Sequence, residues 1–332
     1  MEIMDNIIKK AKGKNKTIIL PEATDERVIK ATRIITDSGI AKIILIGNIE
    51  EIKSKANTID IDLSDIEIID PVKSDHYEEF VKFFYELRKH KGMTYEKAQE
   101  IMKDTVYFGV MMVKKNLADG LVSGAVHSSA DTLRPALQII KARENAGIVS
   151  SFFLMEFDKP KYEKAYIFSD CGLVINPNSE ELSEIAIESN DTYKLLIGDM
   201  PKVAMLSFST KGSAVSDETL KVIEATSKVK EKRTDIIIDG ELQLDSAIDK
   251  VVASKKAPKS TVAGNANVLI FPNLDAGNIG YKLAERFGSA KAYGPITQGL
   301  KKAVNDLSRG CNAEDIVGAV AITCVQADQN ED

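Results

Sequence analysis

The residues best suited to binding chemistry lie between positions 123 and 140. Ser128 and Ser129 stand among several hydroxyl side chains there, and Arg134 follows a few residues later. A short apolar run before them predicts a strand, and an apolar segment after them predicts a helix. A hydroxyl-rich turn before a helix leaves backbone N–H groups free, and the positive helix end and an arginine then favour an anion. We therefore expect a ligand that carries phosphate; the alternative is an ordinary capped helix with Arg134 in solvent.

A second group of reactive side chains stands near the end of the chain. Ser308 and Arg309 are followed by Asp315, and Gly310 and Asn312 between them permit a tight turn. Such a turn would bring a hydroxyl, a guanidinium and a carboxylate to one side. An arginine beside a hydroxyl binds phosphoryl oxygens well, and a carboxylate can take a proton from a thiol or hydroxyl. The alternative is a helix–turn–helix in which Asn312 caps the second helix and Asp315 adds favourable charge to its first turn.

Other polar residues also follow predicted strands or end predicted helices. Arg88 stands at a helix end, where it binds an anion or simply complements the helix dipole. Three further polar clusters follow apolar runs, at 207–213, 239–243 and 272–278. Because ligands of α/β proteins bind beyond the carboxyl ends of parallel strands, these clusters together predict a polar cleft.

Composition excludes several classes of protein. The formal net charge of −6 argues against a general nucleic-acid binder, and the absence of Trp argues against a base-stacking platform. Three histidines supply a multi-histidine metal site poorly. The three cysteines match no disulfide or zinc pattern, so we expect buried, inert thiols at Cys171 and Cys311 and a reducing cytoplasm. No apolar run reaches 18 residues.

The elements that must position these residues alternate between strand and helix. Apolar runs predict strands at 17–21, 42–47 and 66–69, and helical spacing predicts helices at 4–12, 25–38, 77–89 and 95–103. Continuous apolar strands separated by helices indicate a parallel sheet covered on both faces. We place a domain boundary near residue 145.

A second α/β unit follows this boundary. It has predicted strands at 148–157, 165–168, 203–208, 235–239 and 267–271, and predicted helices after 178 and at 217–228 and 244–252. The last stretch, 296–323, contains two helical patterns separated at 308–312.

Several segments together resemble the phosphate acetyltransferase (phosphotransacetylase) family. They are PEATDER (21–27), SGAVHSSADTLRPA (123–136), VAMLSFSTKGS (203–213), DGELQ (239–243), ANVLIFPNLDAGNIGYK (266–282) and LSRG (307–310). The resemblance runs over nearly the whole chain. It implies an α/β fold with two three-layer α/β/α domains of the isocitrate/isopropylmalate dehydrogenase-like type and an active-site cleft between them. The family's last segment returns to the first domain, which implies domains of 1–145 plus 304–332 and 146–303.

The resemblance also implies the reaction, acetyl-CoA plus phosphate to CoA plus acetyl phosphate, by direct attack in a ternary complex. It implies no metal and no cofactor, with coenzyme A as a substrate, and a cytoplasmic homodimer. Carried over by position, Asp315 resembles the base for the CoA thiol, Ser308 the residue that positions the thiol or leaving group, and Arg309 the group that binds phosphate and the carbonyl oxyanion. The residues that resemble binders of CoA or phosphate are Arg134, Arg88 and Arg286, helped by Ser128 and Ser129.

Three other functions compete with this one. A phosphate acyltransferase for a longer chain, such as a butyryltransferase, would differ in pocket volume. A dehydrogenase on the same fold would need a metal-binding aspartate set and a nicotinamide site, and the sequence shows neither. A non-catalytic acyl-CoA-sensing protein would not need Ser308, Arg309 and Asp315.

Overall fold

The computed structural model describes residues 2–144, 146–158 and 165–328. Contacts divide the chain into two compact units. Unit 1 comprises Met1–Lys141 and Leu300–Asp332, and unit 2 comprises Ala142–Gly299. The expected domain limits, at 145/146 and 303/304, stay a prediction.

Unit 1 is built on a five-stranded sheet in the order β11-β4-β1-β2-β3. Every neighbouring pair in it is parallel. The strands are β1 (Thr17–Leu20), β2 (Lys42–Ile46), β3 (Glu67–Ile69), β4 (Gly120–Ser123) and β11 (Ala303–Asp306). Parallel strands align all their carboxyl ends at one edge, so the loops that follow β1, β4 and β11 lie together there.

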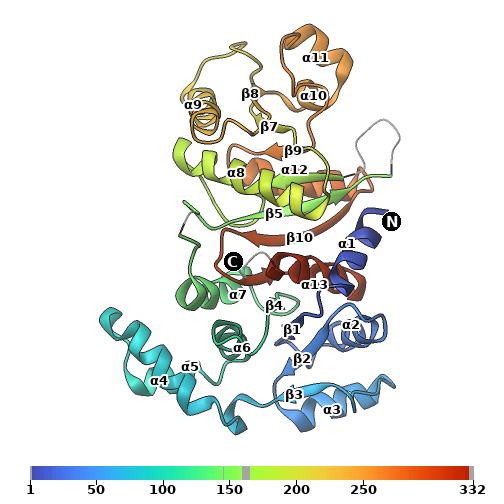
Figure 1. Cartoon of the computed structure of the whole chain (residues 1–332), viewed down its shortest axis with the longest axis vertical. Coiled ribbons are helices and arrows are strands. Elements are labelled where there is room, and N and C mark those ends of the chain that lie inside the picture. The colour runs from blue at the N-terminus through green and yellow to red at the C-terminus, as the bar shows by residue number, and fades with distance from the viewer. Residues whose placement is uncertain (1, 145, 159–164, 329–332) are drawn as a thin grey trace. The chain divides into compact units, whose positions relative to one another are not determined.

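Helices cover this sheet in separate layers (Figure 1). Helix α13 (Ala313–Ala327) contacts β1, β4 and β11 and packs between α1 (Glu2–Lys12) and α2 (Glu26–Asp37). Helix α6 (Thr105–Lys114) contacts β4, and α7 (Ser129–Pro135) continues into a π-helical turn, η3 (Ala136–Ile140). The remaining helices are α3 (Ile49–Thr58), α4 (Tyr77–Arg88) and α5 (Tyr95–Ile101), with short turns η1 (Pro71–Lys73) and η2 (Lys89–Lys91).

Unit 2 contains a six-stranded mixed sheet in the order β10-β5-β6-β9-β7-β8. Its strands are β5 (Ser150–Glu156), β6 (Ala165–Ser169), β7 (Val203–Leu206), β8 (Ile238–Leu242), β9 (Val268–Ile270) and β10 (Lys291–Gln298). The pairs β10–β5 and β5–β6 are antiparallel, and the others are parallel. Its helices are α8 (Ser179–Leu196), α9 (Asp217–Lys232), α10 (Leu244–Ile248), α11 (Lys250–Lys256) and α12 (Leu274–Arg286).

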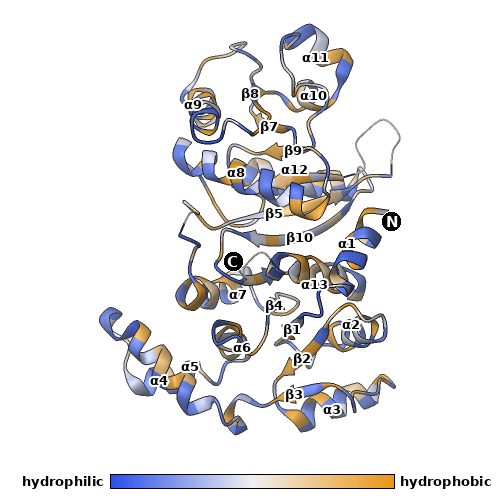
Figure 2. Cartoon of the chain, in the orientation of Figure 1, coloured by the Kyte–Doolittle hydropathy of each residue, from blue (hydrophilic) through white to orange (hydrophobic). Residues whose placement is uncertain are grey.

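Apolar residues form the buried core of each unit, and Figure 2 colours the ribbon by hydropathy. Strands such as β4 are buried along their whole length, as expected for a sheet covered on both faces. Helix α2 instead has one buried apolar face, formed by Val28, Ile29, Ala31 and Ile35, and its charged residues lie on the other face.

One predicted helix is wrong. The stretch from 296 to 307 contains the end of β10 and all of β11. Ile296, Leu300 and Leu307 fall near helical spacing, but all three are buried beside strands. Gly299 between the strands has φ +85°, a left-handed conformation that a helix does not allow. Two smaller differences are that β8 begins at Ile238, and that the helix expected at 244–252 is split at Asp249, which caps α11.

Candidate active site

Two loops at the carboxyl edge of the unit 1 sheet carry three of the predicted site residues, Ser128, Ser308 and Arg309. Loop A (124–128) follows β4, and loop B (307–312) follows β11. The strands are neighbours, with Ser123 in register with Asp306. Gly124 makes their close approach possible: it has φ +114°, and a Cβ there would lie 2.2 Å from Oδ1 of Asp306.

The backbone N–H groups of loop A are already occupied. Oε2 of Glu22 accepts from Gly124 and Ala125 at 2.9 and 2.8 Å, and Oε1 accepts from Val126 and His127 at 2.8 and 2.7 Å. The N–H groups of residues 124–127 therefore do not point outward toward a ligand, contrary to expectation for this part of the turn. A buried carboxylate of the protein itself satisfies them, because Glu22 emerges from β1, the neighbouring strand.

Glu22 also binds the imidazole of His127, whose Nδ1 lies 2.8 Å from Oε1. Burial opposes ionisation of Glu22, but the hydrogen bonds from His127, Val126 and Ala125 outweigh it and lower the pKa of the carboxyl. The same contact raises the pKa of His127, with burial opposing it. Glu22 and His127 thus favour each other's charged form, and their contact together with the four N–H bonds fixes the shape of loop A.

The hydroxyl of Ser128 caps helix α7. It accepts from the N–H of Asp131 at 3.3 Å and donates to that residue's Oδ2 at 2.7 Å. Arg134 lies one turn on, 3.7 Å from Asp131, and its side chain is 58% exposed. Ser129 is exposed beside them. Arg134 is thus accessible to an anion even though loop A's own N–H groups are not.

Loop B is held by Arg27 of α2. The Nη1 group of Arg27 donates to the carbonyls of Arg309 and Cys311 at 2.8 and 3.0 Å, and Nη2 donates to the carbonyl of Ala125 at 2.7 Å. Asp25 holds the other side of the guanidinium. One planar side chain therefore joins loops A and B, which a single ammonium could not do in this geometry.

This arrangement presents the side chains of Ser308 and Arg309 to solvent. Both residues are exposed. Among the described residues, the guanidinium of Arg309 is assigned no ion pair or hydrogen bond, in contrast to that of Arg27. The hydroxyl of Ser308 makes only a long contact, 3.4 Å, with the N–H of Gly310.

Asp315 lies in the first turn of α13, directly after loop B. Its Oδ2 accepts from the N–H of Asn312 at 2.9 Å, and Asn312 accepts from the N–H of Asp315 at 2.9 Å. This capping box agrees with the alternative in which Asn312 caps the helix that contains Asp315. It also fixes the orientation of the carboxylate at the end of loop B, so the capping role and a chemical role are compatible.

Asp306 is a carboxylate that the sequence analysis did not single out. It is fully buried at the end of β11, and neither of its oxygens has a hydrogen-bond partner among the described residues. Burial raises its pKa to about 6, partly offset by the nearby Ser129 hydroxyl and Leu307 N–H. Asp306 thus lies directly before loop B and near Ser129 at the start of α7.

The remaining predicted arginines lie elsewhere. Arg88 ends α4, and its Nε is buried with no hydrogen-bond partner in the part of the chain that the structure describes. Burial raises the pKa of the Tyr107 phenol, while Arg134 and Arg88 both lower it, so the two arginines act on the same side chain. Arg286 belongs to unit 2, where it ends α12 with its side chain 77% exposed.

Two of the polar clusters predicted in unit 2 bind each other. Glu241 is buried and accepts from Ser209 and from the N–H of Gly212 at 2.9 and 2.7 Å. The hydroxyl of Thr210 likewise accepts a hydrogen bond from the N–H of Gln243 at 2.9 Å. In the same unit, Asp170 after β6 accepts the N–H groups of 172–174. Many polar groups of these loops thus form hydrogen bonds with one another.

The thiols are buried, as expected. Burial raises the pKa of Cys311 to about 11 and that of Cys171 well above its usual value. Within the described ranges, no group of three or more His, Cys, Asp or Glu side chains is placed to hold a metal ion. No helix in the same ranges has the length and apolarity needed to cross a bilayer.

Glu22, Arg27 and Asp306 are the site-building residues that the sequence patterns missed. Glu22 and Arg27 stand in the PEATDER segment, so a signal was present without an assigned role. Asp306 sits at the end of a segment predicted as helix, which concealed its position at a strand end.

Comparison with known proteins agrees with this architecture. The family model described as Phosphate acetyl/butaryl transferase matches residues 2–324. A phosphate acetyltransferase of Acetivibrio thermocellus is 56% identical over 329 residues, covering 98% of each chain. A crystal structure of a phosphotransacetylase from Streptococcus pyogenes is 44% identical, covers 99% of this chain and 98% of that one, and superposes with a TM-score of 0.93.

A chain described as a 4-hydroxythreonine-4-phosphate dehydrogenase from Salmonella typhimurium covers 94% of this chain and 99% of its own at 13% identity and a TM-score of 0.51, which shows a shared fold alone. This confirms the two-domain α/β, dehydrogenase-like fold class. With the family model matching almost the whole length, the chain belongs to the phosphate acetyl/butyryl transferase family and is an acyltransferase.

Proposed function

We propose that loops A and B and the start of α13 form the site at which this enzyme exchanges acetyl groups between CoA and phosphate. The activity is that of a phosphate acetyltransferase, which is also the name given to relatives that are 56% and 54% identical to this chain. The observation that carries the assignment of the site is Arg309: an exposed guanidinium on a loop whose backbone is fixed by Arg27, six residues before the anchored carboxylate of Asp315.

Asp315 is proposed to move the proton. A thiol with its ordinary pKa of about 8.5 is mostly protonated at neutral pH, so attack by CoA needs a base. In this direction the proton passes from sulfur to the Asp315 carboxylate, the sulfur forms a bond to the acetyl carbon, and the bond from that carbon to the phosphate oxygen breaks. In the other direction a phosphate oxygen attacks the thioester, and Asp315 returns the proton to the departing sulfur.

Arg309 and Ser308 are proposed to stabilise the charge that develops during this transfer. The guanidinium offers several N–H donors in one plane, which suits both a phosphate and the carbonyl oxyanion. The hydroxyl of Ser308 is proposed to donate to the thiolate or to the leaving oxygen. Fixed backbone carbonyls beneath both residues keep these donors in place as charge moves.

Arg134 and Arg88 are proposed to bind the phosphates of CoA or inorganic phosphate, with Ser128 and Ser129 positioning the anion. Their shared effect on Tyr107 supports a common positive region in unit 1. Arg286 is proposed as a further anion-binding arginine of unit 2, supported by its high exposure. The transfer proposed here uses no metal and no cofactor beyond CoA as substrate.

We also propose a homodimer that forms through unit 2 and resides in the cytoplasm. Ile279, Leu283 and Phe287 are exposed at intervals of four residues along α12, so they form one apolar stripe. A second copy of this chain would cover it. Free thiols at all three cysteines suit a reducing compartment.

The test of the site compares two neighbouring side chains of loop B. Arg309→Ala is expected to lower the phosphate-dependent release of CoA thiol from acetyl-CoA by about 100-fold or more, the usual loss on removing an oxyanion donor. Cys311→Ala is expected to keep activity within about threefold, because the thiol is buried and protonated. Equal losses in the two variants would show that the site is misplaced.

A further inference from the structure

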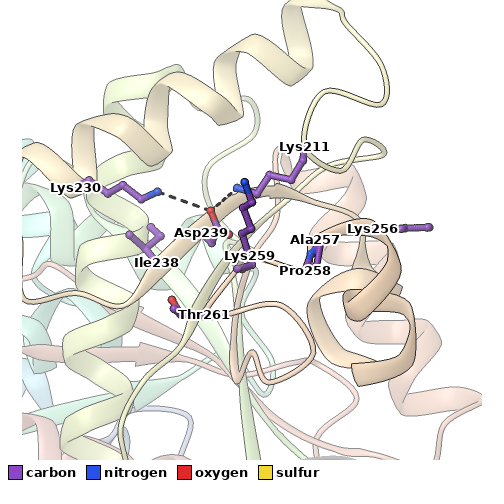
Figure 3. A pocket seen from close by; sticks show the side chains of 10 residues that line it. Lys211, Lys230, Ile238, Asp239, Lys256, Ala257, Pro258, Lys259 and Thr261 are labelled. Atoms are coloured by element: carbon purple, nitrogen blue, oxygen red, sulfur yellow. Dashed lines mark hydrogen bonds and ion pairs between the residues drawn. The ribbon is translucent and has the colours of Figure 1, made fainter.

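Unit 2 contains a cavity of about 580 Å³ beside β8, the edge strand of its sheet (Figure 3). Lysines from three separate elements line it: Lys211 from the loop after β7, Lys230 from α9, and Lys256 and Lys259 from the end of α11 and the loop after it. The volume falls within the usual range of small-molecule sites.

The charge of this cavity is opposite to that of the whole chain. The chain carries a formal net charge of −6, yet the lining holds four lysines and one carboxylate, Asp239. Lys256 is already paired with Asp245 at 2.9 Å and with Gln243, and Figure 3 shows it directed away from the other lysines. Without it, three ammonium groups face one carboxylate, and the remaining charge matches a dianion.

Asp239 contacts two of these lysines and offsets one of the three charges. Its carboxylate pairs with Lys211, and Lys230 lies 3.7 Å from it (Figure 3). Burial disfavours its ionised form, but hydrogen bonds from Lys211 and Ser260 outweigh this and hold the pKa of Asp239 below its usual range. Lys211 has a left-handed backbone conformation, φ +50°. Among the described residues, Lys259 is assigned no ion-pair partner, so its charge is uncompensated.

The rest of the lining is apolar or carries hydroxyls. Ile238, Ala257 and Pro258 supply an apolar wall, and Ser260 and Thr261 supply hydroxyls beside it. A purely inorganic anion would use only the charged part of such a cavity. A ligand with a phosphate at one end and an organic body would use both parts.

We propose that this cavity binds a phosphorylated small molecule of the nucleotide class, with its phosphate between Lys211, Lys230 and Lys259. Lysine binds phosphate as a point charge, and ammonium groups from three elements surround the anion without bidentate geometry. None of these lysines belongs to the transfer site proposed in unit 1, so the cavity is a second anion site. The two proposals can therefore be tested separately.

The experiment is calorimetric titration of the full-length chain with ADP, and in parallel with inorganic pyrophosphate. An Arg309→Ala background removes one anion ligand of the unit 1 site from the signal. We expect ADP to bind, and to bind more tightly than pyrophosphate, because only ADP contacts the apolar wall. No binding of either probe at millimolar concentration would overturn the proposal, and so would tighter binding of pyrophosphate.

One variant and a matched control locate the binding. Lys259→Ala should weaken ADP binding by about tenfold or more, the loss expected for one charge-assisted contact. Lys255 is an exposed lysine on α11 outside the cavity, and Lys255→Ala should leave the affinity for ADP within about twofold of wild type. Equal effects of Lys259→Ala and Lys255→Ala, with both variants folded by circular dichroism, would contradict the assignment.

Discussion

Glu22 and Asp306 are both buried beneath loops A and B, yet their surroundings shift their pKa values in opposite directions. Glu22 receives four backbone N–H groups, which outweigh burial and lower its pKa. Asp306 has no hydrogen-bond partner among the described residues, and burial raises its pKa to about 6. At the residue scale, one carboxylate therefore stabilises the loops and the other is held at a cost to stability.

The cost at Asp306 gives a pH-dependent prediction. Between the pKa of the unfolded chain, near 4, and the folded value of about 6, the native state binds the extra proton, so stability falls as pH rises through this window. Asp306→Asn should remove this fall and raise the free energy of unfolding at pH 7.5 by as much as about 3 kcal/mol, at about 1.4 kcal/mol per pKa unit.

The measurement is urea denaturation of wild type and Asp306→Asn at pH 4.5 and pH 7.5. The gain from the substitution should be larger at pH 7.5 than at pH 4.5. A variant that loses stability at pH 7.5, or gains equally at both, would show that Asp306 is not an unpaired buried acid.

At the scale of elements, Arg27 of α2 sets the geometry of the site without belonging to its chemistry. Arg27→Lys should lower kcat by about 10- to 100-fold, because a single ammonium cannot hold the carbonyls of Ala125, Arg309 and Cys311 together. KM should change less, since Arg134 and Arg88 are untouched.

Arg33→Lys is the matched control for this change. Arg33 lies on the same helix and also binds carboxylates, Asp37 and Asp65, but at the surface. Its replacement should keep kcat within about twofold. Steady-state kinetics of both variants decide the matter, and a larger loss in Arg33→Lys would contradict the role assigned to Arg27.

The sequence predicted β1, β2, β3 and β4 of unit 1 well because each contains a short apolar run between polar loops. It did not predict α6, whose residues from Phe108 to Val113 are all buried, since a helix buried on every side has no periodic polar face. The end of β10 and β11 were mistaken for a helix for a related reason: Ile296, Leu300 and Leu307 fall near helical spacing by coincidence, and the break at Gly299 is conformational.

Prediction of the site was limited by a different kind of information. Hydroxyl and carboxylate residues at strand ends are visible in the sequence, but their partners are not. The carboxylates of Glu22, Asp170 and Glu241 each accept hydrogen bonds from backbone N–H groups of a loop that follows a strand. Sequence spacing cannot distinguish a loop filled this way from one that awaits a ligand, because Glu22 lies 102 residues from Gly124.

For the whole molecule, the apolar stripe on α12 predicts assembly. Wild type should sediment at twice the chain mass of 36.4 kDa, and Leu283→Glu combined with Phe287→Glu should sediment as a monomer, because charges on the stripe prevent its burial. Leu220→Glu, an equally exposed leucine on α9, serves as the control. An unchanged mass in the double variant would place the interface elsewhere.

The central claim is that Asp315, fixed at the start of α13, serves acetyl transfer between CoA and phosphate. Its most direct test is the release of CoA thiol from acetyl-CoA by wild type, Asp315→Asn and the neighbouring control Glu314→Gln, each with and without phosphate. We predict release only with phosphate, a loss of about 100-fold or more in Asp315→Asn, and near-normal turnover in Glu314→Gln. Folded wild type that releases no thiol in response to phosphate, or an Asp315→Asn variant as active as Glu314→Gln, would contradict it.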